Sequence, residues 1–258
     1  MSASLKIMTF NLRCDEISDG INYFFNRLDR IVETLNREKP DVVGFQEVTD
    51  PMRAALRDAL TDYTIQGCGR EADYRGESTV FAYRKDEVEL ISIENRWLSM
   101  TPTVPGSFYG GDQSGDCRMF TSALLKHEKA DKPFRFINTH LDHKGKTARY
   151  LGASQLVQYI SVHPEPFVLT GDFNATPETP EIQAVTDSLG YRGAKDCTAG
   201  LPGTFHWFGK IPEDKRPKID YIFSDVPCTA AYMVEDSPVE GVYYSDHNAV
   251  CAVLNFES

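Results

Sequence analysis

The chain alternates between short apolar runs and longer segments in which apolar side chains recur every three or four positions. Short runs are typical of buried strands, and the wider spacing is typical of helices that bury one face. On this basis we expect strands at Leu5–Phe10, Asp41–Gln46, Ser78–Tyr83, Val88–Ile93, Met119–Lys126, Phe134–Leu141, Phe167–Thr170, Ile219–Phe223, Cys228–Met233 and Ala249–Phe256.

Helices are predicted between these strands. The first spans Asn22–Glu38 and ends before Pro40, with an inward face made of Phe24, Phe25, Leu28, Ile31, Val32 and Leu35. A second begins at Asp50-Pro51, with Asp50 as its cap. A third spans Thr147–Ile160, and Thr179-Pro180 starts a fourth.

The order of these elements favours a particular fold class. Helices alternate with strands at both ends of the chain, whereas the central strands are separated by short polar turns that suggest hairpins. This order fits mixed parallel and antiparallel sheets with helices outside better than a purely parallel sheet. Because no repeat or linker interrupts the chain, we expect one domain over residues 1–258.

Composition narrows the possible functions. The chain is 41% hydrophobic and 25% charged, as in ordinary soluble globular proteins. Its 27 basic and 38 acidic residues give a net charge of −11 without a basic stripe, which disfavours binding to long duplexes or anionic membranes. The six cysteines show no zinc-ligand spacing, and no apolar leader or membrane span is visible. We therefore expect a cytoplasmic protein with free thiols.

Polar residues recur where the apolar strand runs stop. A buried carboxylate costs several kcal/mol unless it is paired or binds a metal, so a whole series of them needs a common explanation. Strand ends that face one way form a shared crevice, which is the usual ligand position in layered α/β folds. The residues at these positions are Asn11, Glu47, His140, Asp172, Asn174, Asp220, Asp246 and His247.

These residue types select a chemistry. Oxygen ligands without cysteine suit Mg²⁺, with Mn²⁺ as an alternative. Histidines beside such a metal can donate to anionic oxygens, and a carboxylate can act as general base, as phosphoester hydrolysis requires. The sequence has no Gly-x-Ser-x-Gly elbow, no Walker loop and no Gly-x-Gly-x-x-Gly motif.

Six short blocks in order resemble the signature of the endonuclease/exonuclease/phosphatase superfamily, whose fold is that of deoxyribonuclease I. They are Thr9-Phe10-Asn11, Gly44-Phe45-Gln46-Glu47, Asn138-Thr139-His140, Gly171-Asp172-Phe173-Asn174, Ile219-Asp220-Tyr221-Ile222 and Ser245-Asp246-His247. Further positions resemble the branch with carbon-catabolite-repressor-type deadenylases and small bacterial members, namely Trp97-Leu98-Ser99, Pro102, Arg118 and Asn138 through His143. The resemblance implies a four-layer sandwich of two packed mixed β-sheets flanked by helices.

The resemblance also implies a metal site. Glu47 would be the main metal carboxylate, helped by Asn11. Asp246 would either bind the metal or orient its ligands.

Catalytic roles follow from the same resemblance. Asp172 would accept the proton of the attacking water, and Asn174 would orient that water or hold the phosphoryl group. Asp220 would hydrogen-bond His247 and favour its charged form. His140 and His247 would donate to the non-bridging phosphoryl oxygens.

Several residues are candidates for substrate contact. Arg118 either contacts phosphate or forms a surface salt bridge, and Asp142 and His143 either line the pocket or only shape the loop. Trp97 fits a core position better than a stacking platform. Aromatic residues in loop-like stretches could either stack on a base or sugar or only pack the loops, and these are Tyr74, Phe108, Tyr109 and Trp207.

Three hypotheses for the function follow. The first is a Mg²⁺-dependent phosphodiesterase that acts like an exonuclease on short nucleic-acid ends, as the deadenylase-like blocks suggest. The second is a phosphatase or phosphodiesterase of a small phosphorylated metabolite, sugar or lipid headgroup, which the acidic charge favours. A non-catalytic scaffold is the third, but it predicts gaps in the polar set, and none is visible. No obligate protein partner is evident from the sequence.

Overall fold

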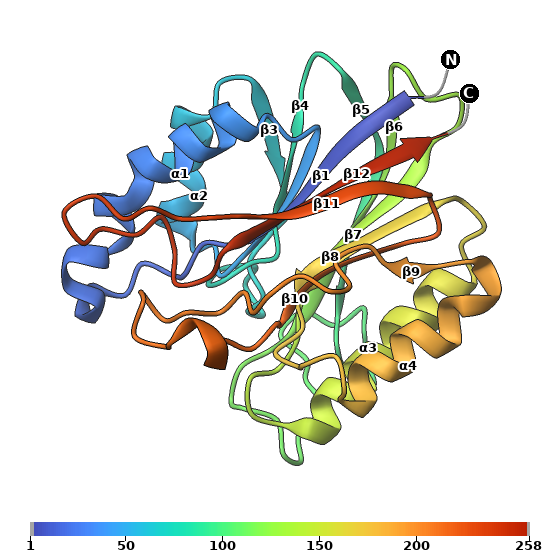
Figure 1. Cartoon of the computed structure of the whole chain (residues 1–258). Coiled ribbons are helices and arrows are strands. Elements are labelled where there is room, and N and C mark those ends of the chain that lie inside the picture. Colours follow the sequence, from blue (N-terminus) through green and yellow to red (C-terminus); the bar gives the residue numbers. More distant parts are fainter. Residues whose placement is uncertain (1–2, 257–258) are drawn as a thin grey trace.

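The apolar runs form two six-stranded sheets, which a computed structural model describes over residues 3–256 (Figure 1). The first sheet has the order β11-β12-β1-β2-β4-β3 and the second the order β5-β6-β7-β8-β10-β9. Strands of the first sheet are β1 (Ala3–Asn11), β2 (Val42–Gln46), β3 (Tyr63–Gln66), β4 (Phe81–Arg84), β11 (Cys228–Val234) and β12 (Ala249–Phe256). Strands of the second are β5 (Val88–Trp97), β6 (Met119–His127), β7 (Phe134–His140), β8 (Phe167–Asp172), β9 (Lys195–Asp196) and β10 (Asp220–Ser224).

Helices cover the outer face of each sheet. On the first sheet lie α1 (Phe24–Glu38) and α2 (Asp50–Ala59), and on the second lie α3 (Lys146–Ser161) and α4 (Pro180–Leu189) (Figure 1). Short 3₁₀ turns occur at η1 (Ile17–Asn22), η2 (Gly190–Arg192) and η3 (Glu213–Lys215). One apolar core fills the space between the sheets, and two others lie under the helices. The four-layer sandwich of mixed sheets is therefore confirmed.

Strand direction explains why polar residues gather at one edge. The pairs β1/β2 and β7/β8 are parallel, so Asn11, Gln46, His140 and Asp172 end their strands together. Strand β10 runs antiparallel to β8 and begins at Asp220, which lies opposite Asp172. Likewise, β12 runs antiparallel to β1 and starts just after His247. Carboxyl ends of parallel strands thus meet amino ends of antiparallel strands at a common edge.

A polar bridge joins the two sheets directly beneath that edge. Gln46 Nε2 donates to Asn138 Oδ1 at 2.7 Å, and Asn138 Nδ2 donates to the backbone oxygen of Phe45 at 2.7 Å. Gly44 leaves room for this contact, because a Cβ there would lie 2.5 Å from both Asn138 Oδ1 and Thr170 Oγ1. The bridge is buried and fixes the position of one sheet against the other.

The structure corrects several expectations. Phe25 is exposed, because the buried face of α1 passes through its neighbour Phe24. Thr49, and not Asp50, precedes the first turn of α2, and the Asp50 carboxylate pairs with Arg53 inside that turn. The central strands do not all form hairpins, since β4 and β5 belong to different sheets and residues 98–118 separate β5 from β6. Strands β3 and β9 were not predicted, whereas Thr179 precedes α4 as expected.

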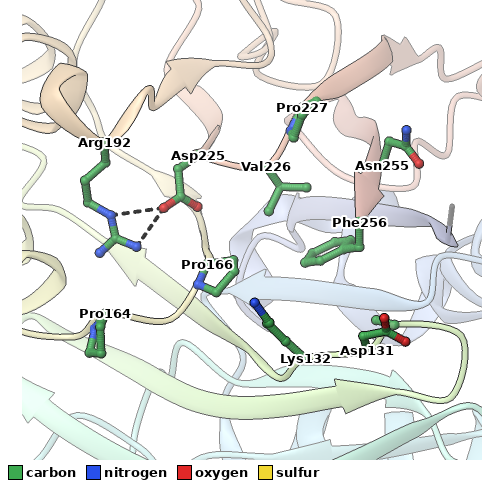
Figure 2. A pocket seen from close by; sticks show the side chains of 11 residues that line it. Asp131, Lys132, Pro164, Pro166, Arg192, Asp225, Val226, Pro227, Asn255 and Phe256 are labelled. Carbon is green, nitrogen blue, oxygen red and sulfur yellow. Dashed lines mark hydrogen bonds and ion pairs between the residues drawn. The ribbon is translucent and has the colours of Figure 1, made fainter. Parts of the chain in front are cut away.

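A second hollow lies at the opposite end of the sandwich, near the last residues of β12. It has a volume of about 500 Å³ and is lined by Arg192, Asp225 and Phe256 among others (Figure 2). Arg192 is fully engaged there, because it donates to Asp225 and to the backbone oxygens of Ile160, His163 and Glu165. At this hollow Arg192 therefore holds neighbouring chain segments together, and none of the predicted site residues lines it.

Candidate active site

A cavity of about 630 Å³ opens at the edge where the polar strand ends meet. Of the residues predicted from the sequence, it is lined by Glu47, Arg118, His140, His143, Asp172, Asn174, Asp246 and His247. Asn11 and Asp220 lie just behind this lining and hydrogen-bond residues of it. Asp142 is 2% exposed and lies behind the wall. The structure thus brings nearly the whole predicted set together.

Asn11 links the two sheets at the floor of the cavity. Its Nδ2 donates to Glu47 Oε1 at 3.0 Å and to Asp172 Oδ2 at 2.9 Å. Its Oδ1 accepts the backbone N–H of Arg13 at 2.9 Å. In this geometry Asn11 orients the two carboxylates, which come from different sheets, and its own oxygen is already bonded.

The backbone around these groups is held in an uncommon conformation. Glu47, Asn174 and Arg13 have φ angles of 63°, 48° and 53°, in the left-handed region that residues other than glycine rarely adopt. Such conformations cost free energy and persist where the surroundings impose them, as at functional sites. Here the Cys14 N–H donates to Glu47 Oε2 at 3.0 Å, and the Asn174 N–H donates to Asp172 Oδ1 at 2.8 Å.

His247 and Asp220 form a buried ion pair. His247 Nδ1 lies 2.9 Å from Asp220 Oδ2, and Nε2 lies 3.8 Å from Asp172 Oδ2. Burial alone would lower the pKa of His247, but the carboxylates of Asp220, Asp172 and Asp246 outweigh it and raise the pKa to about 10. His247 is therefore a cation at neutral pH, with Nε2–H as a donor, as the sequence reasoning expected.

The carboxylates around this cation differ in their protonation. Burial and the charge of Asp220 raise the pKa of Asp172 to about 7, and burial raises the pKa of Asp246 to about 6. Burial would also raise the pKa of Glu47, but the Asn11 hydrogen bond and the charge of His247 lower it below its usual value. Glu47 is thus ionised, whereas Asp172 can gain or lose a proton near neutral pH.

His140 is neutral in this setting. Burial and the positive charges of Arg118 and Arg70 hold its pKa well below the usual value. Its Nε2 lies 3.1 Å from Asn174 Nδ2 and 3.6 Å from Asp172 Oδ2. Asn174 Nδ2 donates to Nε2, so the proton of the neutral imidazole lies on Nδ1. If His140 donates a hydrogen bond to a ligand, it does so through Nδ1.

One wall of the cavity carries arginines. Arg118 is 5% exposed, so it is not a surface residue, and its Nη2 lies 2.9 Å from His143 Nδ1. Its Nε and Nη1 are buried without a hydrogen-bond partner among the described residues, and Nε lies on the side of Asp142. Arg70 stands beside it and donates to Glu77 at 2.9 Å and to Asp116 at 3.1 Å.

Asp142 shapes the loop instead of lining the cavity. It accepts the backbone N–H groups of Gly145 at 2.6 Å and Lys144 at 3.0 Å, and a hydrogen bond from the Ser114 hydroxyl. Burial would raise its pKa, but these hydrogen bonds lower it to about 2. Its Oδ2 also lies 3.6 Å from Arg118 Nε, so it helps to place that side chain.

Sequence reasoning missed part of the cavity lining. The missed residues include Arg13, Cys14, Arg70, Glu77, Asp116, Arg149 and Phe205. Most lie in irregular segments, where no apolar period marks their direction. Trp207 is 51% exposed at the cavity, with Lys210 Nζ 4.7 Å from its ring, whereas Tyr74, Phe108 and Tyr109 do not line it. Trp97 is buried, as expected.

Arg27 supports the site from below, and no sequence pattern predicted this role. Its side chain is fully buried and donates to the backbone oxygens of Leu12 at 2.8 Å, Arg13 at 2.9 Å and Tyr244 at 2.6 Å. No carboxylate within residues 3–256 forms an ion pair with it, and burial lowers its pKa to about 10. Arg27 thus ties together the segments that follow Asn11 and precede Asp246.

Arg27→Met should destabilise the fold by roughly 3–5 kcal/mol, because buried carbonyl groups lose their donor. The measurement is the free energy of unfolding in urea. Arg37→Met is the matched control on the same helix, since the Arg37 side chain is 55% exposed, and it should cost far less. A loss below about 1 kcal/mol for Arg27→Met would contradict this role.

The donor set fits a hard divalent cation. Ligand atoms of Glu47, His140 and Asp172 lie within 4.8 Å of one another, and so do those of Asp172, Asp220 and His247. Asp246 belongs to neither group but lines the same cavity. Burial holds the pKa of Asp172 and of Asp246 above the usual values, even with the positive charge of His247 beside them. A divalent cation near Glu47 would supply the missing positive charge.

Comparison with known proteins agrees with this geometry. Residues 8–247 match the endonuclease/exonuclease/phosphatase family. The crystal structure of an endonuclease/exonuclease/phosphatase from Bacteroides vulgatus is 33% identical, with a TM-score of 0.91 over 99% of this chain and 100% of that one.

More distant structures share the fold. A mannosyl-6-phosphatase from Bacteroides thetaiotaomicron is 26% identical, with a TM-score of 0.85 over 97% of this chain and 99% of that one. D. rerio TDP2, solved with a single-strand DNA product, is 19% identical, with a TM-score of 0.76 over 97% and 98%, and this likeness shows the fold alone. Among residues 3–256, no helix is long and apolar enough to cross a membrane. The strand-end polar set, the four-layer sandwich and the match over residues 8–247 together show that this chain belongs to the endonuclease/exonuclease/phosphatase family of phosphoesterases.

Proposed function

We propose that this protein is a phosphatase of a small phosphorylated metabolite, with a sugar phosphate as the favoured class, and that it depends on Mg²⁺ or Mn²⁺. The observation that carries the proposal is where positive charge lies. Arg13, Arg70, Arg118 and Arg149 line one cavity of about 630 Å³, within the size range of small-molecule sites. Outside it, a chain of net charge −11 has no basic stripe to follow a polynucleotide. The 26% identical mannosyl-6-phosphatase supports the same substrate class.

Glu47 is proposed as the main ligand of the cation, with Asp172 near enough to contribute, Asp246 as a further carboxylate of the same cavity and Asn11 as the orienting group. When bound, a divalent cation neutralises phosphoryl oxygens and favours ionisation of a water. Asp172 is the proposed base, because a pKa of about 7 suits proton transfer near neutral pH. Its two oxygens are held by Asn11 and by the Asn174 N–H, so its direction is fixed.

Donors on three sides would hold the phosphoryl group. His247 offers a charged Nε2–H, His140 a neutral Nδ1–H, and Arg118 its Nη1 group, which has no hydrogen-bond partner among the described residues. Negative charge on the non-bridging oxygens grows in the transition state, so fixed donors there lower the barrier. Arg118, His143 and Asn174 are proposed to orient the phosphoryl group, with Asp142 acting through Arg118.

The test is a substrate panel with controlled metal content. The protein is stripped with chelator and assayed with hexose 6-phosphates, bis-p-nitrophenyl phosphate, short single strands, poly(A) and phospholipid headgroups. We expect activity to vanish with chelator, to return with Mg²⁺ or Mn²⁺ and to be highest on a sugar phosphate. Metal-independent turnover, or a preference for polynucleotide with a steep salt dependence, would contradict the proposal.

An exonuclease-like phosphodiesterase remains a second candidate because of one observation. Trp207 stands half-exposed at the cavity, next to Phe205, whose ring lies 4.9 Å from the His247 imidazole. Such rings can stack on a terminal base. In the panel, this candidate predicts that short single strands exceed hexose phosphates in kcat/KM, and that Trp207→Ala lowers kcat/KM for strands only.

Asp220→Asn should change the pH profile of the reaction. Loss of the carboxylate lets the pKa of His247 fall from about 10 toward the ordinary value of about 6.5. His247 can donate to the phosphoryl group only while it is protonated. The pH at which kcat falls on the alkaline side should therefore be lower by two or more units. Stability supplied by the raised pKa is full below about pH 6.5 and is lost as the pH rises through about 10. An alkaline limb that stays in place would rule out this pairing as the source of the charged donor.

A further inference from the structure

Two cysteines far from the cavity lie on the exposed edges of the two sheets. Cys197 directly follows β9, the last strand of one sheet, and its N–H donates to Ile222 of β10 at 2.8 Å. Cys228 begins β11, the last strand of the other sheet, and pairs with Leu254 of β12. The proposed function uses neither residue.

Strand register places both thiols in the layer between the sheets. Residues directly opposite each other on neighbouring strands point to the same face. Ile222 and Leu254 both belong to the core between the sheets, so Cys197 and Cys228 face that core from opposite sides. Cys197 packs against this core, and the Cys228 thiol lies close enough to it to help raise its pKa. A surface groove of about 450 Å³ is lined by both residues, so reagents can reach the pair.

We propose that Cys197 and Cys228 are a modification site, at which a peroxide-type oxidant joins the two sheets through a reversible disulfide. Both cysteines are thiols in the structure, as are the other four, so the reduced form is the one described. The disulfide would close the free edge of the sandwich, where no main-chain hydrogen bond connects β9 to β11.

The chemistry assigns different parts to the two thiols. Cys228 is exposed, so its thiolate attacks the peroxide, and one oxygen atom passes to sulfur while water leaves. Burial and the neighbouring thiol raise the pKa of Cys197, so it stays protonated until the second step. Its sulfur then displaces hydroxide from the Cys228 sulfenic acid, which forms the disulfide and releases a second water. Overall, two thiols lose two electrons and two protons to one hydrogen peroxide. A dithiol such as dithiothreitol reverses the change.

The ring closed by this bond encloses residues 198–227, which include part of the candidate site. Phe205 and Trp207 of this segment line the cavity, and Asp220 holds His247. A disulfide would therefore anchor both ends of the segment that carries one cavity wall. Oxidation is expected to raise the melting temperature of the folded protein by several degrees, since cross-links restrict the unfolded chain.

The experiment uses the full chain in its native state. The protein is treated with hydrogen peroxide, remaining thiols are blocked with iodoacetamide, and peptides from digestion without reductant are analysed by mass spectrometry. We expect a peptide pair joined between Cys197 and Cys228, two hydrogens lighter than the reduced pair and absent after dithiothreitol. The melting temperature should rise on oxidation in the wild type but not in Cys228→Ser. Cys68→Ser, which alters a half-buried thiol elsewhere, should keep both effects.

Two results would overturn the proposal. One is oxidation of Cys228 to a sulfinic acid while Cys197 is recovered as the free, alkylated thiol. The other is a cross-link that forms only after the protein is denatured. Neither readout uses turnover, so the outcome is independent of whether the proposed phosphatase activity is correct.

Discussion

Asp172→Asn is expected to lower kcat by about 10²–10⁴-fold, the usual contribution of a general base. Asparagine keeps the size of the side chain and one acceptor oxygen, so it can keep the contact to Asn11 or to the Asn174 N–H, but it cannot take a proton. The effect should therefore fall on kcat, with KM little changed. Steady-state kinetics on the best substrate of the panel measures it, and Asp187→Asn, an exposed acid on α4, is the matched control. Turnover within a few-fold of wild type would exclude Asp172 as the base.

The same variant should make the metal-free protein more stable at pH 8. Burial and Asp220 raise the pKa of Asp172 to about 7, so its ionisation in the folded state opposes folding. This penalty is absent below the unfolded pKa of about 3.9 and is complete above about pH 7. Melting temperatures in chelator should therefore favour Asp172→Asn at pH 8 and converge with the wild type near pH 4. A gain that does not depend on pH would point to packing instead of charge.

Glu47→Gln is expected to weaken Mn²⁺ binding by about 10²-fold or more and to lower kcat/KM at least as much. Glu47 is the carboxylate at the cavity floor whose pKa is lowered, so it supplies a full negative charge. Glutamine preserves one acceptor oxygen, for either Asn11 or the Cys14 N–H, but removes that charge. Calorimetric titration with Mn²⁺ gives the affinity without turnover, and Glu33→Gln on the exposed side of α1 serves as control.

An unchanged Mn²⁺ affinity in Glu47→Gln would contradict the proposed ligand. The second group of potential ligands, Asp172, Asp220 and His247, would then become the candidate centre. That arrangement requires His247 to lose its proton, because a charged imidazole cannot bind a cation. Metal affinity would then keep rising up to about pH 10, whereas the affinity of the Glu47-centred site should level off above about pH 7.

The sequence predicted the fold where strands are long and fully buried. Strands β2, β7 and β8 are buried at every position, and the apolar residues of these runs, like those of β1, indicate burial without a structure. β3 has one buried residue and β9 only two residues, so neither shows a period to detect. Phe25 was misplaced because two adjacent phenylalanines cannot both lie on the buried stripe of one helix, and the sequence does not show which one does. Similarly, the order of strands and hairpins along the chain does not show whether they form one sheet or two.

For the site, the sequence indicated residues that end strands, because strand direction alone brings them together. It could not indicate Arg70, Glu77 or Arg27, whose positions depend on how loops and helices pack. The direction of Asp142 was also open, since only the 143–145 turn decides that its carboxylate faces backbone N–H groups. The roles of the gathered residues remain predictions that the variants above can test.

The hydrogen-bonded bridge of Gln46 and Asn138 lies directly behind the candidate active site, whose residues come from both sheets. Glu47 and Asp246 come from one layer, whereas His140, Asp172 and Asp220 come from the other. Neither layer alone holds a complete set of reacting groups. Activity should therefore depend on the relative position of the two sheets. A displacement of one sheet against the other that is too small to unfold any strand should already abolish activity.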